Sequence, residues 1–448
     1  MTRLLSACVL ALSLLASVVT AANKYPIVLV HGLGGWGRGE FLGIPYWGTL
    51  QGDFQEKLKK EGYQVYTVGI GKVSSNWDRA CELYAQIKGG RVDYGSNHSK
   101  IHGHERYGRT YPGLFPQWGT VVNGELQKVH LMGHSMGGET IRMLTQMLNK
   151  GVQDALTTED PSSHPLFAGG KDWVHSVTTI STPNRGSTLA DMLASQIDLI
   201  ENVIAGTFGA LGLLGDLTAS VYDPVLDQWG IKPKQPGEKL DVYIKRVLSS
   251  KMFAPGYLDN AGFSLATKGT AAENSWVKTL PNVYYYSFVS EGTFSSIDLL
   301  WRKIALPNLL VMNPLVAPLA TLMGSRETVK LGFSDDWLPN DGFVNVVSQI
   351  SDGVSKVVDF SGRSQRGAWT RFKTLKMDHL GMMGANPLIP VYDIYKAHAA
   401  LVADLPAHET FNGKRMLRTA ANETAEEAHD APLAIVHAVF AAQDPLAA

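Results

Sequence analysis

Cysteine is nearly absent from this chain of 448 residues, which contains only Cys8 and Cys81. Cys8 lies in an N-terminal segment that we expect to be removed, so the mature chain would keep one cysteine and could form no internal disulfide. A small domain stapled by disulfides is therefore excluded, and stability must come from a large packed core. We expect Cys81 to be a small buried apolar side chain rather than a reactive thiol.

The chain also lacks an excess of charge of either sign. Lys and Arg number 40, Asp and Glu number 41, and the formal net charge is −1. No long basic run is present, and this absence disfavours nucleic acid as a partner.

Apolar runs long enough to span a membrane are missing too. The run from Leu4 to Val19 follows Arg3 and precedes Thr20-Ala21-Ala22. It falls short of the roughly 20 apolar residues of a membrane span, and it predicts a signal peptide over residues 1–21 and a secreted, extracellular protein. A second run, Leu306 to Met323, is interrupted by three prolines. We therefore expect no transmembrane anchor.

The most informative motif that is present surrounds Ser135. Val129 to Met132 reads as a short buried strand, which runs directly into Gly-His-Ser-Met-Gly, and Glu139 to Leu148 then reads as a helix. Glycines on both sides of the serine allow the sharp strand-to-helix turn that exposes a nucleophilic hydroxyl. An ordinary turn would explain the bare motif, but the flanking strand and helix indicate that Ser135 is the nucleophile of a hydrolase.

Short apolar runs recur along the chain and alternate with helical patterns, which indicates a mostly parallel sheet flanked by helices. The expected strands are Tyr25–Val30, Tyr63–Ile70, Val129–Met132, Val174–Ile180, Val283–Val289 and Phe372–Met377, with a helix at Phe54–Glu61 between the first two. The predicted fold class is α/β, in the form of an α/β-hydrolase, with one catalytic domain over residues 22–402.

A serine nucleophile requires a histidine to accept its proton and a carboxylate to orient that histidine. In α/β-hydrolases the order along the chain is serine, acid, histidine. Of the histidines beyond any plausible acid, His379 alone directly follows an expected strand, and Asp341 lies in the tight turn Asn-Asp-Gly. We expect a triad of Ser135, Asp341 and His379, with Asp378 as a weaker candidate for the acid.

Two further features complete the expected site. The backbone N–H groups of Leu33 and Met136 would form the oxyanion hole, because they follow the first strand and the nucleophile. An apolar segment at about 189–220 suggests a helical lid, although a buried core helix is the alternative.

From residue 403 to 448 the pattern changes to that of a flexible tail.

With these residues in hand, the chain resembles the bacterial lipases of the Geobacillus and Staphylococcus group, called family I.5. The motifs that carry the resemblance stand in matching order along about 24–402: VLVHG at 28–32, SSNWDRACELYAQ at 74–86, VDYG at 92–95, HGHERYGRTYPGL at 102–114, GHSMGG at 133–138, LDQWG at 226–230, WLPNDGFVN at 337–345 and DHL at 378–380. The resemblance implies an α/β-hydrolase fold with a lid and a zinc-binding insertion, hydrolysis of triacylglycerols, and the triad already inferred.

The resemblance also implies a structural zinc ion held by two aspartates and two histidines. Matched motif by motif, the ligands would be Asp78, His98, His104 and Asp227. Four such ligands make a closed tetrahedral site that leaves no position for a catalytic water. Without the resemblance these histidines would read as a polar surface loop.

The chain departs from the family pattern where the family carries an acidic pair that helps to hold calcium. Here Gly381 has no side chain and Asn386 has no charge. Calcium is bound by charged oxygen ligands, so we expect this chain to attract it weakly.

These observations together predict a secreted triacylglycerol lipase acting on lipid esters at an oil–water interface through a Ser-His-Asp acyl-enzyme mechanism. Two alternatives remain at this point. One is a carboxylesterase or phospholipase that uses the same triad, and the other is a non-catalytic lipid-binding relative of the same fold.

Overall fold

The computed structural model describes residues 23–407, apart from 41–42, 154, 156 and 194–222, together with residues 429–430. The predicted signal peptide lies outside the described residues. So do the predicted lid from residue 194 onward and most of the predicted tail.

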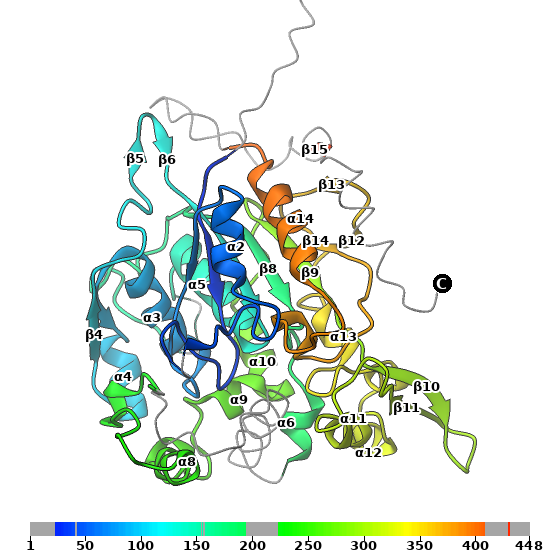
Figure 1. Cartoon of the computed structure of the whole chain (residues 1–448). Helices are drawn as coiled ribbons and strands as arrows, with labels where there is room; N and C mark the ends of the chain where they lie inside the picture. The colour runs from blue at the N-terminus through cyan, green and yellow to red at the C-terminus, as the bar shows by residue number, and fades with distance from the viewer. Residues whose placement is uncertain are drawn as a thin grey trace, which may run out of the picture.

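A seven-stranded sheet forms the centre of the molecule (Figure 1), with the strand order β12-β14-β9-β8-β7-β1-β2. Every neighbouring pair in it is parallel. Its strands are β1 (Ile27–Val30), β2 (Val65–Thr67), β7 (Val129–His134), β8 (Val174–Ile180), β9 (Tyr284–Phe288), β12 (Val357–Asp359) and β14 (Trp369–Arg371). The α/β fold class predicted from the sequence is confirmed.

Helices connect these strands. The longer ones are α3 (Asn76–Lys88), α5 (Met136–Lys150), α8 (Leu240–Leu248), α10 (Thr267–Asn274) and α14 (Tyr392–Ala403). The shorter ones are α2 (Phe54–Lys60), α4 (Ser96–His102), α6 (Thr188–Met192), α9 (Ala261–Leu265), α11 (Ala317–Met323), α12 (Arg326–Lys330) and α13 (Val346–Gln349). Single turns of 3-10 helix are η2 (Asp227–Trp229), η3 (Lys251–Phe253), η4 (Asp335–Trp337) and η5 (Gly381–Met383).

Within the described residues, four two-stranded pairs lie outside the central sheet, and all are antiparallel. They are β3 (Gly90–Asp93) with β4 (Tyr107–Tyr111), β5 (Val121–Val122) with β6 (Glu125–Leu126), β10 (Thr293–Ile297) with β11 (Lys303–Pro307), and β13 (Arg363–Ser364) with β15 (His429–Asp430). In Figure 1 the β10–β11 hairpin projects from the edge of the molecule beside α11 and α12.

The apolar side chains of the sheet divide between its two faces because successive residues of a strand point in opposite directions. Ile27 and Leu29 of β1 join the core on the face covered by α2 and α14. Val28 and Val30 join the core on the face covered by α3 and α5. A sheet covered on both faces explains why its strands read as continuous apolar runs.

Five of the six expected strands are present in the sheet, but the strand predicted over Phe372–Met377 is wrong. The strand at this place is β14, which ends at Arg371, and the following residues are irregular. Phe372 and Leu375 are buried in the core without forming a strand, so an apolar run alone gave the wrong boundary. The run from Leu306 to Met323 forms the end of β11, a turn and α11. Within the described part of the chain, no helix combines the length and apolar character needed to cross a membrane.

Candidate active site and metal centre

Ser135 occupies the sharp turn between β7 and α5. Its backbone has φ 56° and ψ −132°, a conformation rare for a residue with a side chain. A Cβ atom at Gly133 would lie 2.4 Å from the carbonyl carbon of Gly137, and one at Gly137 would lie 2.3 Å from the Val30 oxygen. The two glycines of the motif are therefore required by the close approach of β7, α5 and β1 around the serine.

The other two predicted triad residues are in direct contact. Nδ1 of His379 lies 2.9 Å from Oδ2 of Asp341, and both side chains are buried. The backbone N–H of His379 also donates to the carbonyl oxygen of Asp341. This double contact fixes the position of the imidazole relative to the carboxylate.

The Asp341 carboxylate is fully buried and accepts hydrogen bonds at both oxygens. Its donors are Phe343 N at 3.0 Å, Val344 N at 2.8 Å, Ser290 Oγ at 2.8 Å, Gln349 Nε2 at 3.1 Å and His379 Nδ1. Ser290 and Gln349 could not be predicted from the sequence, because each reaches Asp341 only through the tertiary fold.

Asp378, the weaker acid candidate, accepts hydrogen bonds from backbone N–H groups of its own loop and of the segment after β11. Its carboxylate accepts from the N–H groups of Leu380, Gly381 and Asn313, at 3.0, 2.8 and 2.6 Å. Burial raises the pKa of Asp378 above its usual value. The structure therefore places Asp341, not Asp378, against the ring of His379.

The loop predicted to supply one oxyanion donor lies beside the serine. A Cβ atom at Gly32 would be 2.6 Å from Cβ of Ser135 and 3.2 Å from its Oγ, so a larger residue at this place would fill the space next to the hydroxyl. Leu33 follows directly in this loop, and Met136 is the first residue of α5. Leu33 therefore follows the glycine that approaches Ser135, and Met136 lies at a helix N-terminus, which favours negative charge.

Two buried side chains hold the Gly32 loop in place. The guanidinium of Arg79 donates to the carbonyl oxygens of His31 and Gly71 and, at 2.9 Å, to Oγ1 of Thr140 in α5. His31 accepts from Ile70 N through Nε2, and its Nδ1 lies 2.8 Å from the oxygen of Gly32. Burial, together with Lys72 and Arg79, lowers the pKa of His31 well below its usual value, so this ring is neutral.

A hydrogen-bonded chain joins the Gly32 loop to the loop of His379. Gly32 N donates to the Tyr46 hydroxyl at 3.1 Å, and that oxygen lies 2.7 Å from Nδ1 of His134. Nε2 of His134 lies 2.9 Å from the backbone oxygen of His379. Since a carbonyl can only accept, His134 carries its proton on Nε2 and accepts from Tyr46 at Nδ1. These hydrogen bonds join residues that lie far apart in the sequence.

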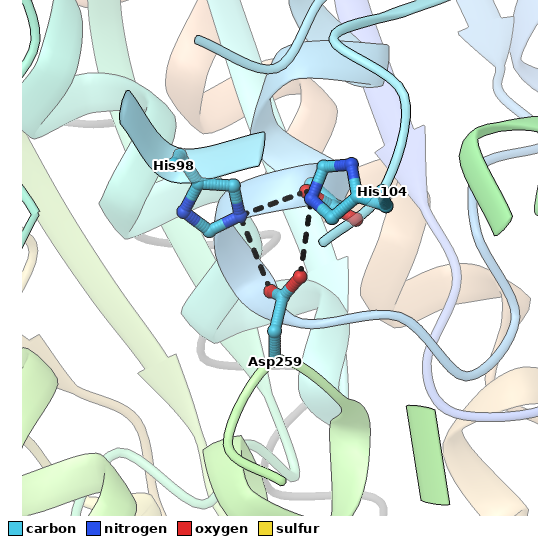
Figure 2. Close-up of side chains that lie close together, drawn as sticks. His98, His104 and Asp259 are labelled. Atoms are coloured by element: carbon cyan, nitrogen blue, oxygen red, sulfur yellow. Dashed lines mark ion pairs between the residues drawn. The ribbon is translucent and has the colours of Figure 1, made fainter. Parts of the chain in front are cut away.

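A second cluster of titratable side chains lies beside α3 and α4. Asp78, His98, His104 and Asp259 each offer one ligand atom, and these atoms all lie within 4.8 Å of one another. Figure 2 shows His98 and His104 facing Asp259; His98 Nε2 is 3.3 Å and His104 Nε2 is 3.4 Å from its carboxylate oxygens. His98 Nε2 also lies 3.2 Å from Oδ1 of Asp78. The arrangement can hold a metal ion with two nitrogen and two oxygen ligands.

The cluster leaves its own polar atoms unsatisfied, and this supports a metal site. Among the described residues, Asp78 Oδ1, both carboxylate oxygens of Asp259 and the Nε2 atoms of His98 and His104 are buried without a hydrogen-bond partner. Buried polar groups without partners are costly, and a cation at the centre would satisfy them together. Two other side-chain atoms of these residues contact groups outside the cluster. Asp78 Oδ2 accepts from Gln228, and Nδ1 of His104 contacts the oxygen of Glu105, as is usual for metal ligands.

The prediction of Asp227 as a ligand is wrong. Its carboxylate is partly exposed and pairs with Arg109, which also binds Asp223. The fourth side chain of the group that could hold a metal ion is Asp259, in the loop before α9. Asp259 stands alone in Gly-Tyr-Leu-Asp-Asn-Ala-Gly, where only the fold, and no local spacing, places it near the two histidines.

Comparisons with known proteins show what the chain is similar to. Residues 23–401 match the family model described as "Lipase-like, C-terminal domain". The chain is 34% identical to Lipase 2 of Staphylococcus aureus over 381 residues, which are 83% of this chain and 52% of that protein. The chain thus spans about half the length of the curated relatives it matches.

Two solved structures are similar to the chain over most of their own length. EstA from Clostridium botulinum has a TM-score of 0.75 and 41% identity, covering 88% of this chain and 91% of that one. Lipase 1 from Pelosinus fermentans has a TM-score of 0.72 and 38% identity, covering 85% of this chain and 99% of that one.

Proposed function

This chain belongs to the lipase-like family that its residues 23–401 match, and from this we propose that it is a serine lipase that hydrolyses carboxylic esters of long-chain acylglycerols. The observation that carries the proposal is the buried contact between Asp341 and His379. The backbone oxygen of His379 also contacts Nε2 of His134, the residue before Ser135. A correctly ordered serine, acid and histidine has no use in a non-catalytic lipid-binding protein, so that alternative is disfavoured.

In the proposed reaction, Oγ of Ser135 attacks the ester carbonyl while Nε2 of His379 takes its proton. Asp341 accepts the Nδ1 proton of His379 in a hydrogen bond, which fixes the tautomer and stabilises the imidazolium that forms. The imidazolium then donates its proton to the departing alcohol, and the acyl group remains on Ser135. Water attacks this acyl-enzyme with His379 again acting as the base, and the fatty acid leaves.

The negative charge of the tetrahedral intermediate would be held by the backbone N–H groups of Leu33 and Met136. The support for this assignment is the position of Gly32 against Ser135 and of Met136 at the first turn of α5. Arg79 and the Tyr46–His134 chain position these groups without contacting substrate.

We propose that the cluster of Asp78, His98, His104 and Asp259 holds zinc. Two imidazoles and two carboxylates suit that ion, and four protein ligands make the site structural rather than catalytic. Bound zinc would join α3, α4 and the loop before α9.

The weak calcium binding expected from Gly381 and Asn386 stays a prediction.

Residues 1–21 are proposed to direct export and then to be removed. The protein recovered from the culture medium of an expressing bacterium should begin at Ala22 or Asn23, as read by N-terminal sequencing.

The experiment that tests the function compares the wild-type protein with Ser135→Ala on emulsified long-chain triacylglycerol. Ester hydrolysis that disappears in the variant, while circular dichroism stays the same, supports the proposal. Equal hydrolysis by both proteins refutes the nucleophile.

A carboxylesterase or phospholipase on the same triad is the second candidate, because a serine activated by His379 and Asp341 can attack any carboxylic ester that reaches it. Parallel assays on a soluble short-chain ester and on phosphatidylcholine separate these activities. A preference for the soluble ester identifies an esterase, and release of fatty acid mainly from phosphatidylcholine identifies a phospholipase.

A further inference from the structure

The hairpin of β10 and β11 carries three consecutive large apolar side chains at its tip. Leu299, Leu300 and Trp301 have relative exposures of 99%, 68% and 83%. Figure 1 places this hairpin at the periphery, pointing away from the sheet and its covering helices. Large apolar side chains gathered on a protruding element are typical of contact with a membrane or another apolar surface.

The tip is held in shape by its polar residues. The carboxylate of Asp298 accepts from the backbone N–H groups of Leu300 and Arg302, at 2.8 and 3.0 Å, and from the Arg302 guanidinium at 2.7 Å. Trp301 adopts φ 59°, which is unusual for a residue with a side chain. The ion pair of Asp298 with Arg302 cancels the negative charge of the turn that carries the exposed apolar side chains.

The base of the hairpin is bonded to the loops of the proposed triad. Just before β10, Ser290 Oγ donates to Asp341. Thr293 Oγ1 donates to the oxygen of Asn340, beside Asp341, at 3.1 Å. Just after β11, Asn313 N donates to Asp378, beside His379, at 2.6 Å. The hairpin that carries the tip is therefore anchored to the loops of the proposed acid and base.

Exposed leucines continue from the hairpin toward that edge. Leu309, Leu310 and Leu315 follow β11 with relative exposures of 63%, 81% and 51%. They lie in the same short segment as Asn313, which contacts Asp378. Exposed apolar side chains are thus present both at the tip and in the segment whose Asn313 contacts the loop of His379.

We propose that the β10–β11 hairpin inserts its Leu299-Leu300-Trp301 tip into the surface of aggregated ester substrate and holds the enzyme there. The inference rests on the proposed function and adds a binding element to it. An oil surface fits this tip because aliphatic and aromatic side chains next to a cation, here the exposed Lys303, anchor at such boundaries.

The test uses droplets of emulsified triolein and proteins in the Ser135→Ala background, so that no substrate is consumed. We expect Leu299→Ser/Leu300→Ser/Trp301→Ser to lower the fraction bound per unit of droplet surface by at least about tenfold, because three apolar side chains are lost. Val121→Ser, an exposed apolar residue on the separate β5–β6 hairpin, is the control and should change binding less than about twofold.

Failure of this inference can be distinguished from failure of the proposed function. With Ser135 intact, the triple variant should hydrolyse a soluble short ester at the wild-type kcat/KM and lose activity only on the emulsion. Unchanged droplet binding by the triple variant overturns the inference, even when soluble-ester hydrolysis still depends on Ser135. A wild-type dimer that the triple variant converts to a monomer, with droplet binding unchanged, overturns it as well and assigns the tip to a second copy.

Discussion

At the scale of single residues, Asp341 determines how His379 is held. Replacing it with Asn keeps the shape but offers an amide N–H to Nδ1, which favours the wrong tautomer of the imidazole. We expect Asp341→Asn to lower kcat on a soluble ester by about 10⁴-fold with little change in KM.

Ser290→Ala is the matched control for that variant. It removes one of several donors to Asp341 and leaves the charge in place, so kcat should fall by less than about tenfold. A loss as large as that of Asp341→Asn would mean that Ser290 does more than support the carboxylate.

The metal cluster provides a second residue-scale prediction. Asp259→Ala should lower the zinc content of the purified protein, measured by plasma mass spectrometry, and reduce its thermal stability. Asp227→Ala removes a partly exposed carboxylate that pairs with Arg109, and it should retain the zinc. Loss of zinc in Asp227→Ala with retention in Asp259→Ala would reverse the ligand assignment.

How well a residue's place could be predicted from sequence depended on how local its determinants are. The turn at Ser135 is fixed by the glycines at 133 and 137, so the sequence alone predicted its conformation. Asp259 and Tyr46 reach their partners only when distant segments pack together. Asp227 attracted the wrong assignment because it lies in a family motif, whereas its carboxylate is paired with an arginine in the folded chain.

At the scale of elements, a pair of buried glutamates connects three helices. Nδ2 of Asn76 in α3 donates to Glu139 of α5 at 3.3 Å and to Glu273 of α10 at 2.8 Å. Burial raises the pKa of Glu273 to about 7 and that of Glu139 well above its usual value, although Arg142 opposes both shifts. The two carboxyl groups therefore hold protons in the folded protein at pH values where they would ionise in the unfolded chain.

The sign of the resulting pH dependence follows from these raised pKa values. The protonated carboxyl groups contribute their full stabilisation of the folded state below about pH 4.5. This contribution is lost as the pH rises through about 7, because the unfolded chain releases its protons first. Between about pH 5 and pH 8 we expect the free energy of unfolding to fall by a few kcal/mol from this pair. Glu273→Gln should reduce that slope in denaturant titrations at matched zinc concentration. An unchanged slope would show that the pair does not titrate in this range.

Element boundaries were the least predictable part of the fold. The apolar run at 372–377 was read as a strand, but Phe372 and Leu375 are buried by packing after β14 has ended. A buried irregular segment and a buried strand both appear in the sequence as a short apolar run. The strands β1, β7 and β8 were easier to predict because each lies between covered faces of the sheet and is bounded by a clear turn.

At the scale of the whole molecule, stability comes from the two cores on either side of the sheet. Cys81 is free and buried in α3, as the sequence predicted, and burial raises the pKa of its thiol. We expect the unfolding temperature to be the same with and without a thiol reductant. A reductant-dependent shift would indicate a disulfide between chains.

The same thiol can report on opening of the fold. Because Cys81 belongs to the core under α3 and α5, a thiol reagent should modify it only when that core opens. Its labelling rate should therefore follow denaturant concentration in parallel with global unfolding, as measured by circular dichroism. Rapid labelling without denaturant would mean that this face of the sheet opens locally.

The strand order also has a consequence for a chain that leaves the ribosome from its N-terminus. After β1 and β2 have paired, β7, β8 and β9 each add to the same growing edge in the order of their synthesis. Each of these strands meets a parallel neighbour that has already been made. Only β12 must wait, because its neighbour β14 is synthesised after it. Assembly of the sheet can thus proceed from one side while the chain is still emerging, and the last step is the closure of the far edge around β14.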